Sequence, residues 1–244
     1  MFNDNIKYRV LGHRGVPGKE IENTVASFKR AIDDGADGVE LDIRVTKDNK
    51  LVVSHDNCLK RVYGADILVE SSTYDEIKSR APEIATLGEV FDALGEVYYD
   101  IEIKADQPVD YKKEIVPLLL KELDKRKNLW PKIMVSSFNP LAIRQFAKAS
   151  KNRFEMAIIY DGAPTSLPFI MRHGEGRHFF KCTFLKPKYN IATREKRWKR
   201  KWQICPWTVD TEDVLEEMLK LNPPFIITNE TEKIVKILQE RNHR

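Results

Sequence analysis

Short apolar runs with high strand propensity alternate with amphipathic helical patterns along almost the whole chain, and this alternation constrains the fold more than any other feature. Strands separated by helices pair in parallel through right-handed crossovers. Eight such runs favour an α/β fold closed into a (β/α)8 TIM-type barrel over an open sheet. The runs are "YRVLGH" (8–13), "GVELDI" (38–43), "VYYDIEIK" (97–104), "KIMVSSF" (132–138), "FEMAIIY" (154–160), "FFKCTF" (179–184), "QICPWTV" (203–209) and "FIITN" (225–229).

The second run continues into a segment that returns toward it. "LVVSH" (51–55) has the pattern of a further strand, but the linker "TKDNK" is too short for a crossover helix. We therefore expect residues 38–55 to run past the barrel rim, turn within the linker and return as a β-hairpin extension. Residues 56–96 exceed an ordinary crossover and hold two helical patterns, so we expect a small inserted subdomain after the second strand. The chain shows no interdomain linker, which predicts a single domain over 1–244.

The composition is typical of a globular protein. Of the 244 residues, 42% are hydrophobic, which is enough for a sizeable core. Lys and Arg number 41 and Asp and Glu 37, and the net charge of +4 does not by itself indicate nucleic-acid binding. The 3 cysteines form no CxxC pair and suggest neither a disulfide framework nor a zinc site. The first residues hold no apolar leader, and no run approaches the ~20 apolar residues of a membrane span, so we expect a cytoplasmic protein.

Carboxylates occur where barrel enzymes carry their active sites, at the C-terminal ends of the strands. Glu40 and Asp42 are two residues apart and so point to the same side of one strand, and Glu102 lies on the next. Converging carboxylates repel one another unless a cation lies between them, and all-oxygen ligation suits Mg²⁺ or Ca²⁺. The alternative places Glu40 and Asp42 on the outside of the strand, where helices would cover their charges unfavourably. We favour one divalent cation, Mg²⁺ or Ca²⁺, on these three residues.

Histidines and fixed positive charges accompany these carboxylates. His13 ends the first run and His55 ends the hairpin, and imidazoles with pKa values near neutrality suit general acid and base catalysis. Arg14 and Lys104 would hold a phosphate beside the metal. For Arg14 a surface ion pair with Glu22 is an alternative, and both can hold if Glu22 orients the guanidinium. The whole set indicates phosphoester chemistry.

These motifs resemble those of the glycerophosphodiester phosphodiesterase family, within the phosphatidylinositol phospholipase C-like phosphodiesterase superfamily. The resemblance runs nearly the whole length and rests on "GHRG" with "ENT", "GADGVELDIRVTKDNKLVVSHD", "IEIK", "SSF" and "WTVD". It implies a TIM-type barrel with an inserted small subdomain. It also implies hydrolysis of glycerophosphodiesters to glycerol 3-phosphate and an alcohol.

By motif position, the resemblance implies a role for each candidate residue. His13 and His55 would be the acid/base pair, one taking a proton from the glycerol 2-hydroxyl to give a cyclic phosphate and the other protonating the leaving alcohol. Which histidine starts is left open, and direct attack by metal-bound water is the competing route. The metal ligands would be Glu40, Asp42 and Glu102, and the substrate or phosphate contacts Arg14, Lys104, Trp207 and Phe138.

Three positions depart from the family's pattern. Ile21 stands where Pro is usual before "ENT", Asp210 ends "WTVD" where Asn is commoner, and Asn229 ends "IITN" where Asp is usual. We expect these changes to touch the substrate rim and the barrel closure rather than the metal and histidine set. They therefore bear on the identity of the substrate more than on activity.

The same fold also admits a lipid substrate. The tract "TREKRWKRKW" (193–202) carries six Lys or Arg among residues 194–201 and two tryptophans four residues apart. Weak contact with an anionic membrane surface would suit a lysophospholipase D or sphingomyelinase-D-like enzyme, although a barrel helix that buries both tryptophans is the preferred interpretation. Nucleic-acid binding is disfavoured because the charge is local and lacks exposed stacking aromatics. We expect a small-molecule glycerophosphodiester partner; the head group, the choice between Mg²⁺ and Ca²⁺ and the oligomeric state are left open.

Overall fold

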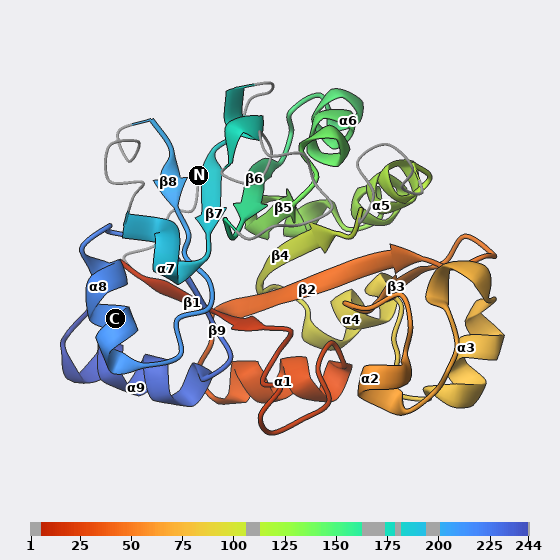
Figure 1. The fold of residues 1–244 in the computed structure, drawn as a ribbon, viewed down its shortest axis with the longest axis horizontal. Helices are drawn as coiled ribbons and strands as arrows, with labels where there is room; N and C mark the ends of the chain where they lie inside the picture. The colour runs from red at the N-terminus through yellow and green to blue at the C-terminus, as the bar shows by residue number, and fades with distance from the viewer. Residues whose placement is uncertain (1–5, 106–112, 163–173, 179–181, 194–200, 244) are drawn as a thin grey trace.

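Parallel strands form a nearly closed barrel in the computed structural model (Figure 1). The structure describes residues 6–105, 113–162, 174–178, 182–193 and 201–243. The predicted TIM-type barrel is confirmed, with eight parallel strands in this part of the chain. They are β1 (Arg9–His13), β2 (Gly38–Val45), β4 (Tyr98–Ile103), β5 (Ile133–Ser137), β6 (Glu155–Tyr160), β7 (Phe184–Pro187), β8 (Gln203–Ile204) and β9 (Phe225–Thr228).

The chain beyond the edge strand β8 lies against the other edge strand, β9, and nearly closes the barrel. The strand order is β8-β7-β6-β5-β4-β2-β1-β9, and each neighbouring pair in it is parallel. Beyond β8, the backbone amide of Val209 donates to the carbonyl of Ile227 (2.9 Å), and the amide of Ile227 donates to that of Pro206 (3.4 Å). These two bonds bring the chain after β8 against β9.

Two strands differ from their predicted bounds by more than two residues. The run at 179–184 predicted a strand of which residues 179–181 lie outside the described part of the chain. The ladder with β6 is made by Phe184 and the three residues after it. The run at 203–209 predicted a longer strand than β8. Its regular pairing stops before Pro206, which has no N–H to donate.

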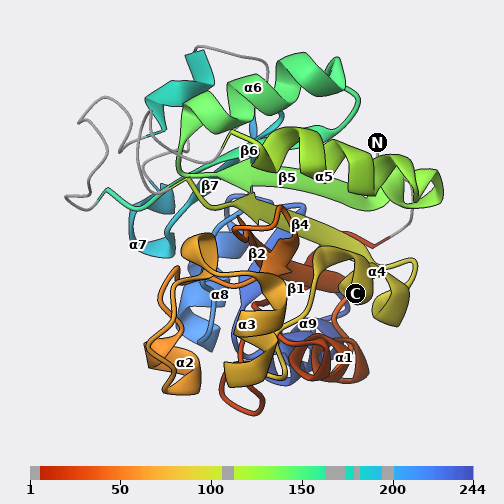
Figure 2. The ribbon, with the colours of Figure 1, turned by 90° about the vertical axis from the view of Figure 1, so that its right-hand side faces the viewer.

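Helices cover the outside of the barrel (Figures 1 and 2). Several begin at a threonine whose hydroxyl accepts a first-turn amide: Thr24, Thr73, Thr86 and Thr211. Within the described residues, no helix is both long enough and apolar enough to cross a bilayer. The helices are α1 (Val25–Asp33), α2 (Lys60–Tyr63), α3 (Tyr74–Arg80), α4 (Leu87–Leu94), α5 (Ile115–Asp124), α6 (Pro140–Ser150), α7 (Tyr189–Ala192), α8 (Glu212–Leu219) and α9 (Thr231–Glu240), with 3-10 turns η1 (Val69–Ser71), η2 (Lys127–Lys132) and η4 (Glu175–His178).

Alternation along the strands places a polar layer on an apolar floor. Leu11 of β1, Met134 of β5 and Phe184 of β7 belong to this floor. Two residues further along each strand, on the same side of it, lie His13, Ser136 and Lys186. The floor therefore closes the barrel below the polar side chains. Its buried side chains are Leu11, Met134, Ala157, Phe184, Cys205, Phe225 and Ile227.

The second strand carries the predicted β-hairpin. β2 extends past its neighbours and pairs antiparallel with β3 (Leu51–Val53), with Ile43 opposite Val53. Asn49 closes the turn at φ 61°, a left-handed conformation that asparagine tolerates. The hairpin extension is therefore confirmed. Residues 56–96 carry α2, η1, α3 and α4 beside it (Figure 1). Val52 of β3 and residues of this segment form a separate apolar cluster, whereas the buried side chains of α4 belong to the main core. The cluster contains Val52, Leu59, Val69, Ile77, Ala81 and Ile84.

Candidate active site

Three buried carboxylates converge in the polar layer. Glu40 and Asp42 lie on β2 and Glu102 on the adjacent β4, where the parallel register sets Asp42 opposite Glu102. One oxygen of each carboxylate lies within 4.8 Å of the others. The alternative that placed Glu40 and Asp42 outside the barrel is wrong, because their carboxylates meet that of Glu102.

Neighbouring cations neutralise only part of this charge. Lys104 Nζ lies 2.5 Å from Glu102 and 2.9 Å from Asp42. Arg14 Nε lies 3.4 Å from Asp42. Burial raises the pKa of Asp42, but the charges of Lys104 and Arg14 outweigh it and hold that pKa well below the usual range. Burial and the charge of Asp42 raise the pKa of Glu40, and burial raises the pKa of Glu102 despite Lys104. The pKa values of Glu40 and Glu102 thus stay raised despite the neighbouring cations, and a divalent cation among the three carboxylates would offset their charge.

His13 is fixed at the end of β1. Its Nδ1 lies 2.8 Å from the side-chain oxygen of Asn229, and its Nε2 lies 3.9 Å from an oxygen of Glu40. Burial and the charge of Arg14 lower the pKa of His13 to about 4. The ring is therefore a neutral imidazole at neutral pH, with Nε2 on the side of the carboxylates.

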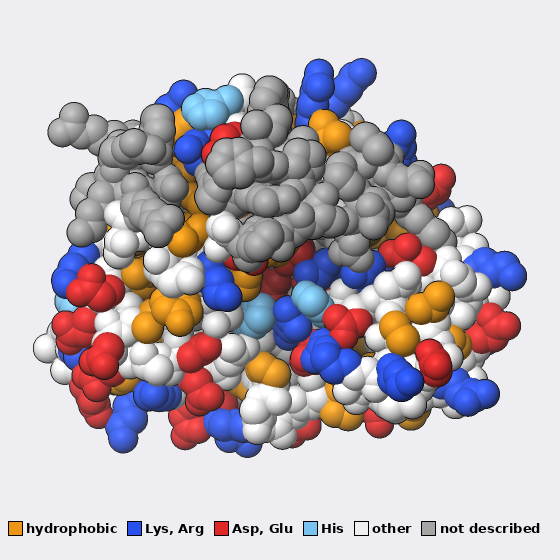
Figure 3. Space-filling view, viewed as in Figure 1, with side chains coloured by type: hydrophobic (Ala, Val, Ile, Leu, Met, Phe, Trp, Pro, Cys, Tyr) orange, Lys and Arg blue, Asp and Glu red, His pale blue; other side chains and the backbone are white. Residues whose placement is uncertain are grey.

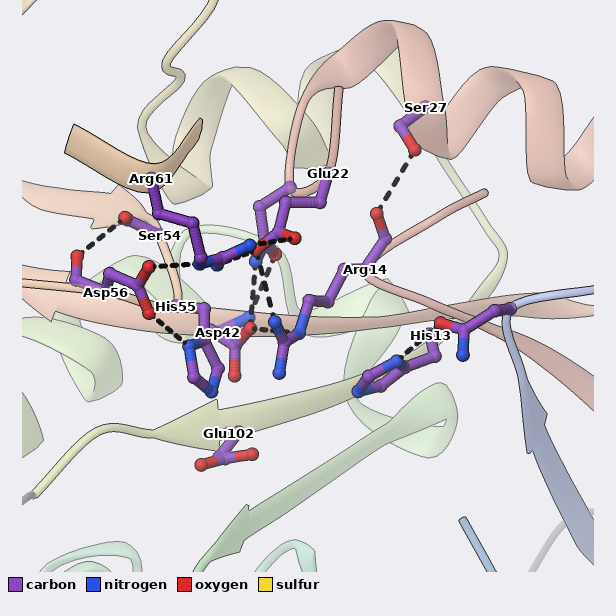
Figure 4. A network of polar contacts seen from close by, with 12 residues as sticks. His13, Arg14, Glu22, Ser27, Asp42, Ser54, His55, Asp56, Arg61 and Glu102 are labelled. Carbon is purple, nitrogen blue, oxygen red and sulfur yellow. Dashed lines mark hydrogen bonds and ion pairs between the residues drawn. The ribbon is translucent and has the colours of Figure 1, made fainter. Parts of the chain in front are cut away.

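His55 reaches the same place from the returning arm of the hairpin (Figure 4). Its Nδ1 lies 2.6 Å from one oxygen of Asp56, and Arg61 Nε donates to the other oxygen at 2.6 Å. The carbonyl of His55 accepts two hydrogen bonds from Arg44 of β2, at 2.9 and 2.8 Å. Burial and the charge of Lys104 lower the pKa of His55. Both the main chain and the ring of His55 are thus held by neighbouring side chains.

Arg14 extends between the two histidines (Figure 4). Its Nη1 donates to Glu22 at 3.1 Å, and Arg61 donates two further bonds to the Glu22 carboxylate at 2.9 and 2.6 Å. The main chain of Arg14 is left-handed (φ 55°) and accepts a bond from the amide of Asn23 at 3.0 Å. The expected pairing with Glu22 is confirmed, and it coexists with the approach of Arg14 to the carboxylates.

These groups line a cavity of about 220 Å³ with an apolar wall opposite them. Phe138 and Trp207 pack edge to face there, with ring centres 5.7 Å apart, and the Trp207 ring lies 6.4 Å from that of His13. Ile159 and Ile227 complete the wall. Figure 3 shows histidine, basic and acidic side chains gathered around a hollow in this face of the molecule. A cavity that is charged on one side and apolar on the other suits a phosphate attached to a short carbon skeleton.

The structure brings all nine predicted site residues together. Asp42 is fully buried next to the residues that line the cavity, paired with Lys104 and near Arg14. The other eight line the cavity, namely His13, Arg14, Glu40, His55, Glu102, Lys104, Phe138 and Trp207.

Sequence reasoning missed a buried ion pair at the cavity, which Lys186 also lines. Lys186 of β7 pairs with Asp100 of β4, and both are almost fully buried. Ser136 bridges them, because its hydroxyl donates to Asp100 (2.7 Å) and accepts from Lys186 (3.1 Å). Asp100 could have been found, since it lies two residues before Glu102 and shares its face. Lys186 fell outside the predicted strand at 179–184.

The departures from the family pattern at 210 and 229 lie closer to the histidines than expected. They do lie at the barrel closure, as predicted. However, the Asn229 side chain contacts His13, and Asp210 accepts two hydrogen bonds from Asn229, at 2.8 and 2.9 Å. The expectation that these residues leave the histidine set untouched is therefore wrong.

The fold and the site together define a barrel hydrolase whose rim combines two histidines with a carboxylate cluster. The sequence profile of the Glycerophosphoryl diester phosphodiesterase family matches residues 13–233. The chain belongs to that family.

Individual proteins show the same relationship. The glycerophosphodiester phosphodiesterase of Caldanaerobacter subterraneus subsp. tengcongensis is 30% identical over 250 residues, which cover 96% of this chain and 99% of that protein. The crystal structure of the glycerophosphodiester phosphodiesterase from Thermotoga maritima superposes with a TM-score of 0.75 at 29% identity, covering 97% of this chain and 100% of that one. Lysophospholipase D GDPD1 of Homo sapiens is 34% identical over 135 residues, or 48% of this chain and 41% of that protein.

Proposed function

We propose that this protein hydrolyses glycerophosphodiesters to glycerol 3-phosphate and an alcohol. The observation that carries the proposal is one cavity that unites carboxylates, two histidines, three cationic side chains and an aromatic wall. Membership of the family supports the same reaction. Phe138 and Trp207 would pack against the carbon skeleton of glycerol, opposite the groups that act on the phosphate.

Glu40, Asp42 and Glu102 would hold one divalent cation. Their clustered oxygens offer the ligation that Mg²⁺ or Ca²⁺ requires. When bound, such an ion withdraws negative charge from the phosphate oxygens. Arg14 and Lys104 would neutralise the remaining phosphate charge, Arg14 through its planar fork and Lys104 as a point charge.

His13 and His55 would move the protons. One ring takes the proton of the glycerol 2-hydroxyl as that oxygen bonds to phosphorus, and the other donates a proton to the alcohol oxygen as its bond to phosphorus breaks. Water then opens the resulting cyclic phosphate with the two roles reversed, which yields glycerol 3-phosphate. Asn229 and Asp56 occupy the Nδ1 atoms, which leaves Nε2 of each ring for the substrate. Each such group typically contributes about 10²–10⁴-fold to the rate.

A substrate panel tests the reaction and its metal. Glycerophosphocholine, glycerophosphoethanolamine, glycerophosphoinositol and lysophosphatidylcholine are each incubated with EDTA, Mg²⁺ or Ca²⁺. We expect release of glycerol 3-phosphate that depends on the metal, and full turnover in EDTA would refute the carboxylate site. His13→Ala and His55→Ala should each lower kcat at least about 100-fold, while the circular dichroism spectrum stays unchanged. A loss below about tenfold would remove that histidine from the mechanism.

A substrate analogue separates the two routes of attack. A glycerophosphocholine analogue that lacks the 2-hydroxyl cannot form a cyclic phosphate. If it is hydrolysed as fast as glycerophosphocholine, water attacks phosphorus directly. If it is inert, and ³¹P NMR detects a cyclic phosphate with the natural substrate, the 2-hydroxyl is the nucleophile.

A lysophospholipase D activity is the second candidate, favoured by the partial similarity to the human enzyme of that name. The lysophosphatidylcholine arm of the panel tests it. Membrane contact through 193–202 was the alternative to a barrel helix that buries both tryptophans, and residues 194–200 lie outside the described part of the chain. Trp202 is buried in the hydrophobic core. Co-sedimentation with anionic vesicles at low and high salt tests the tract directly, and binding that high salt abolishes would support it.

A further inference from the structure

Behind His13 lies a polar pair, Asn229 and Asp210, and the proposed reaction assigns no role to Asp210. One oxygen of Asp210 accepts hydrogen bonds from the backbone amide of Asn229 (2.8 Å) and the hydroxyl of Thr228 (3.0 Å). The other oxygen accepts from Asn229 Nδ2 (2.9 Å) and the hydroxyl of Thr208 (2.8 Å). Asn229 Oδ1 lies 2.8 Å from His13 Nδ1. The carboxylate, the amide and the imidazole thus form one hydrogen-bonded chain.

The chemistry of Asp210 fixes the orientation of the Asn229 amide. An ionised carboxylate accepts hydrogen bonds and donates none, so the end of the amide that faces it must be the NH₂ group. The carbonyl oxygen of Asn229 then faces His13. Because that oxygen can only accept, His13 Nδ1 must carry the hydrogen. In a neutral imidazole this leaves Nε2 without a proton.

We propose that Asp210 is a positioning residue that acts through Asn229 to hold His13 in the tautomer whose Nε2 lone pair faces the cavity. The proposal rests on the proposed function, in which His13 transfers a proton. Nε2 lies on the side of the carboxylates, 3.9 Å from Glu40. The opposite tautomer would present an N–H there and could not take a proton from a substrate hydroxyl.

The pair is exchanged relative to the family pattern rather than lost. Asn is commoner at position 210 and Asp is usual at position 229, and this chain carries each residue type at the other position. Either arrangement contains one carboxylate and one amide, and the side chain of Asn or of Asp at position 229 has an acceptor oxygen that can face His13 Nδ1. They differ in the place of the negative charge, which here is separated from the imidazole by the amide.

Each single substitution should therefore disturb the tautomer of His13, and the double substitution should restore it. Asp210→Asn puts a second amide behind Asn229, which can then turn either end toward His13. Asn229→Asp sets two carboxylates at hydrogen-bonding distance, and their repulsion separates them or protonates one. In D210N/N229D the amide at position 210 donates to the carboxylate at position 229, and that carboxylate accepts a hydrogen bond from His13 Nδ1.

The test compares kcat and KM of the unmodified protein, the two single variants and the double variant on the best substrate of the panel with its metal. We expect each single variant to lose at least about tenfold in kcat with little change in KM, because an imidazole in the wrong tautomer cannot act as base. D210N/N229D should recover to within about threefold of the unmodified protein. Asp213→Asn, an exposed acid at the start of α8, is the matched control and should have no effect.

Long-range ¹H–¹⁵N NMR of the histidine rings supplies a readout that does not need turnover. The His13 signals are assigned by their absence in His13→Gln. We expect an Nδ1–H tautomer in the unmodified protein and in D210N/N229D, and a mixture in D210N. An unchanged His13 tautomer in D210N would overturn the proposal. So would a double variant whose loss of kcat equals the losses of the two single variants combined. If the unmodified protein hydrolyses no panel substrate, the proposed function fails while the tautomer measurement still decides the role of Asp210.

Discussion

Replacing Arg61 by glutamine should weaken both the fold and the reaction, because this one guanidinium supports two separate parts of the site (Figure 4). Arg61 lies on α2, in the segment that follows the hairpin. Its fork donates one bond to Asp56, the partner of His55, and two bonds to Glu22, the partner of Arg14. Arg61→Gln keeps a polar side chain and removes the charge and most of the fork.

The expected magnitude follows from exposure and geometry. The Arg61 side chain is 52% exposed, so solvent screens its ion pairs. At about 0.5 kcal/mol for each of its three hydrogen bonds, the variant should lose about 1.5 kcal/mol of the free energy of unfolding. The same substitution loosens the side chains of His55 and Arg14. A similar loss of transition-state stabilisation corresponds to about a tenfold decrease in kcat/KM.

The assay measures kcat/KM for glycerophosphocholine and the urea unfolding curve for three variants. Arg61→Gln should show both losses. Arg61→Lys should recover only part of them, because an ammonium cannot reproduce a planar fork. Lys60→Gln removes the same charge from an exposed neighbouring position and should behave like the unmodified protein. If Arg61→Gln keeps kcat/KM within about twofold and an unchanged urea midpoint, these contacts form only a surface ion cluster and the reasoning is refuted.

Three further predictions concern buried charge, pH and metal. Lys186→Met leaves the Asp100 carboxylate buried without its partner, so urea unfolding should show a loss of about 3–5 kcal/mol, whereas D100N/K186M should lose less. Burial raises the pKa of Glu22, but hydrogen bonds from Arg61 outweigh it and lower that pKa below its ordinary value of 4.5. The resulting stabilisation is present above pH 4.5 and is lost as pH falls through the lower folded-state pKa. Thermal unfolding at a series of pH values should therefore show that Tm falls less on acidification in Arg61→Gln than in the unmodified protein. Addition of Mg²⁺ or Ca²⁺ should raise Tm without any substrate, and Glu102→Gln should abolish the rise; an equal rise in that variant would place the cation elsewhere.

Period-two alternation made the carboxylate cluster predictable from the sequence. Glu40 and Asp42 had to share one face of a strand, and the rule that barrel sites lie at strand ends placed them beside Glu102. The short linker after β2 likewise predicted the hairpin and brought His55 back toward them. Each of these inferences depends on neighbours within one strand or on adjacent strands.

Contacts that depend on closure of the whole barrel could not be predicted in this way. His13 and Asn229 are 216 residues apart, and only the meeting of β1 with β9 sets them together. Arg61 belongs to a four-residue helix that has no periodicity to orient it toward Glu22, 39 residues earlier. Lys186 was missed for a local reason, since β7 begins where the predicted strand ended.

The hairpin of β2 and β3 ties the spacing of the site to the length of one turn. Glu40 and Asp42 precede this turn and His55 follows it, so every residue between them sets their separation. One residue inserted between 45 and 51 would shift the returning arm by about 3.3 Å and direct His55 to the opposite face. Ordinary surface loops tolerate insertions at small cost. For anyone redesigning this barrel, the turn is therefore a spacer whose length must be kept, while its residues can be exchanged wherever the left-handed conformation at Asn49 is respected.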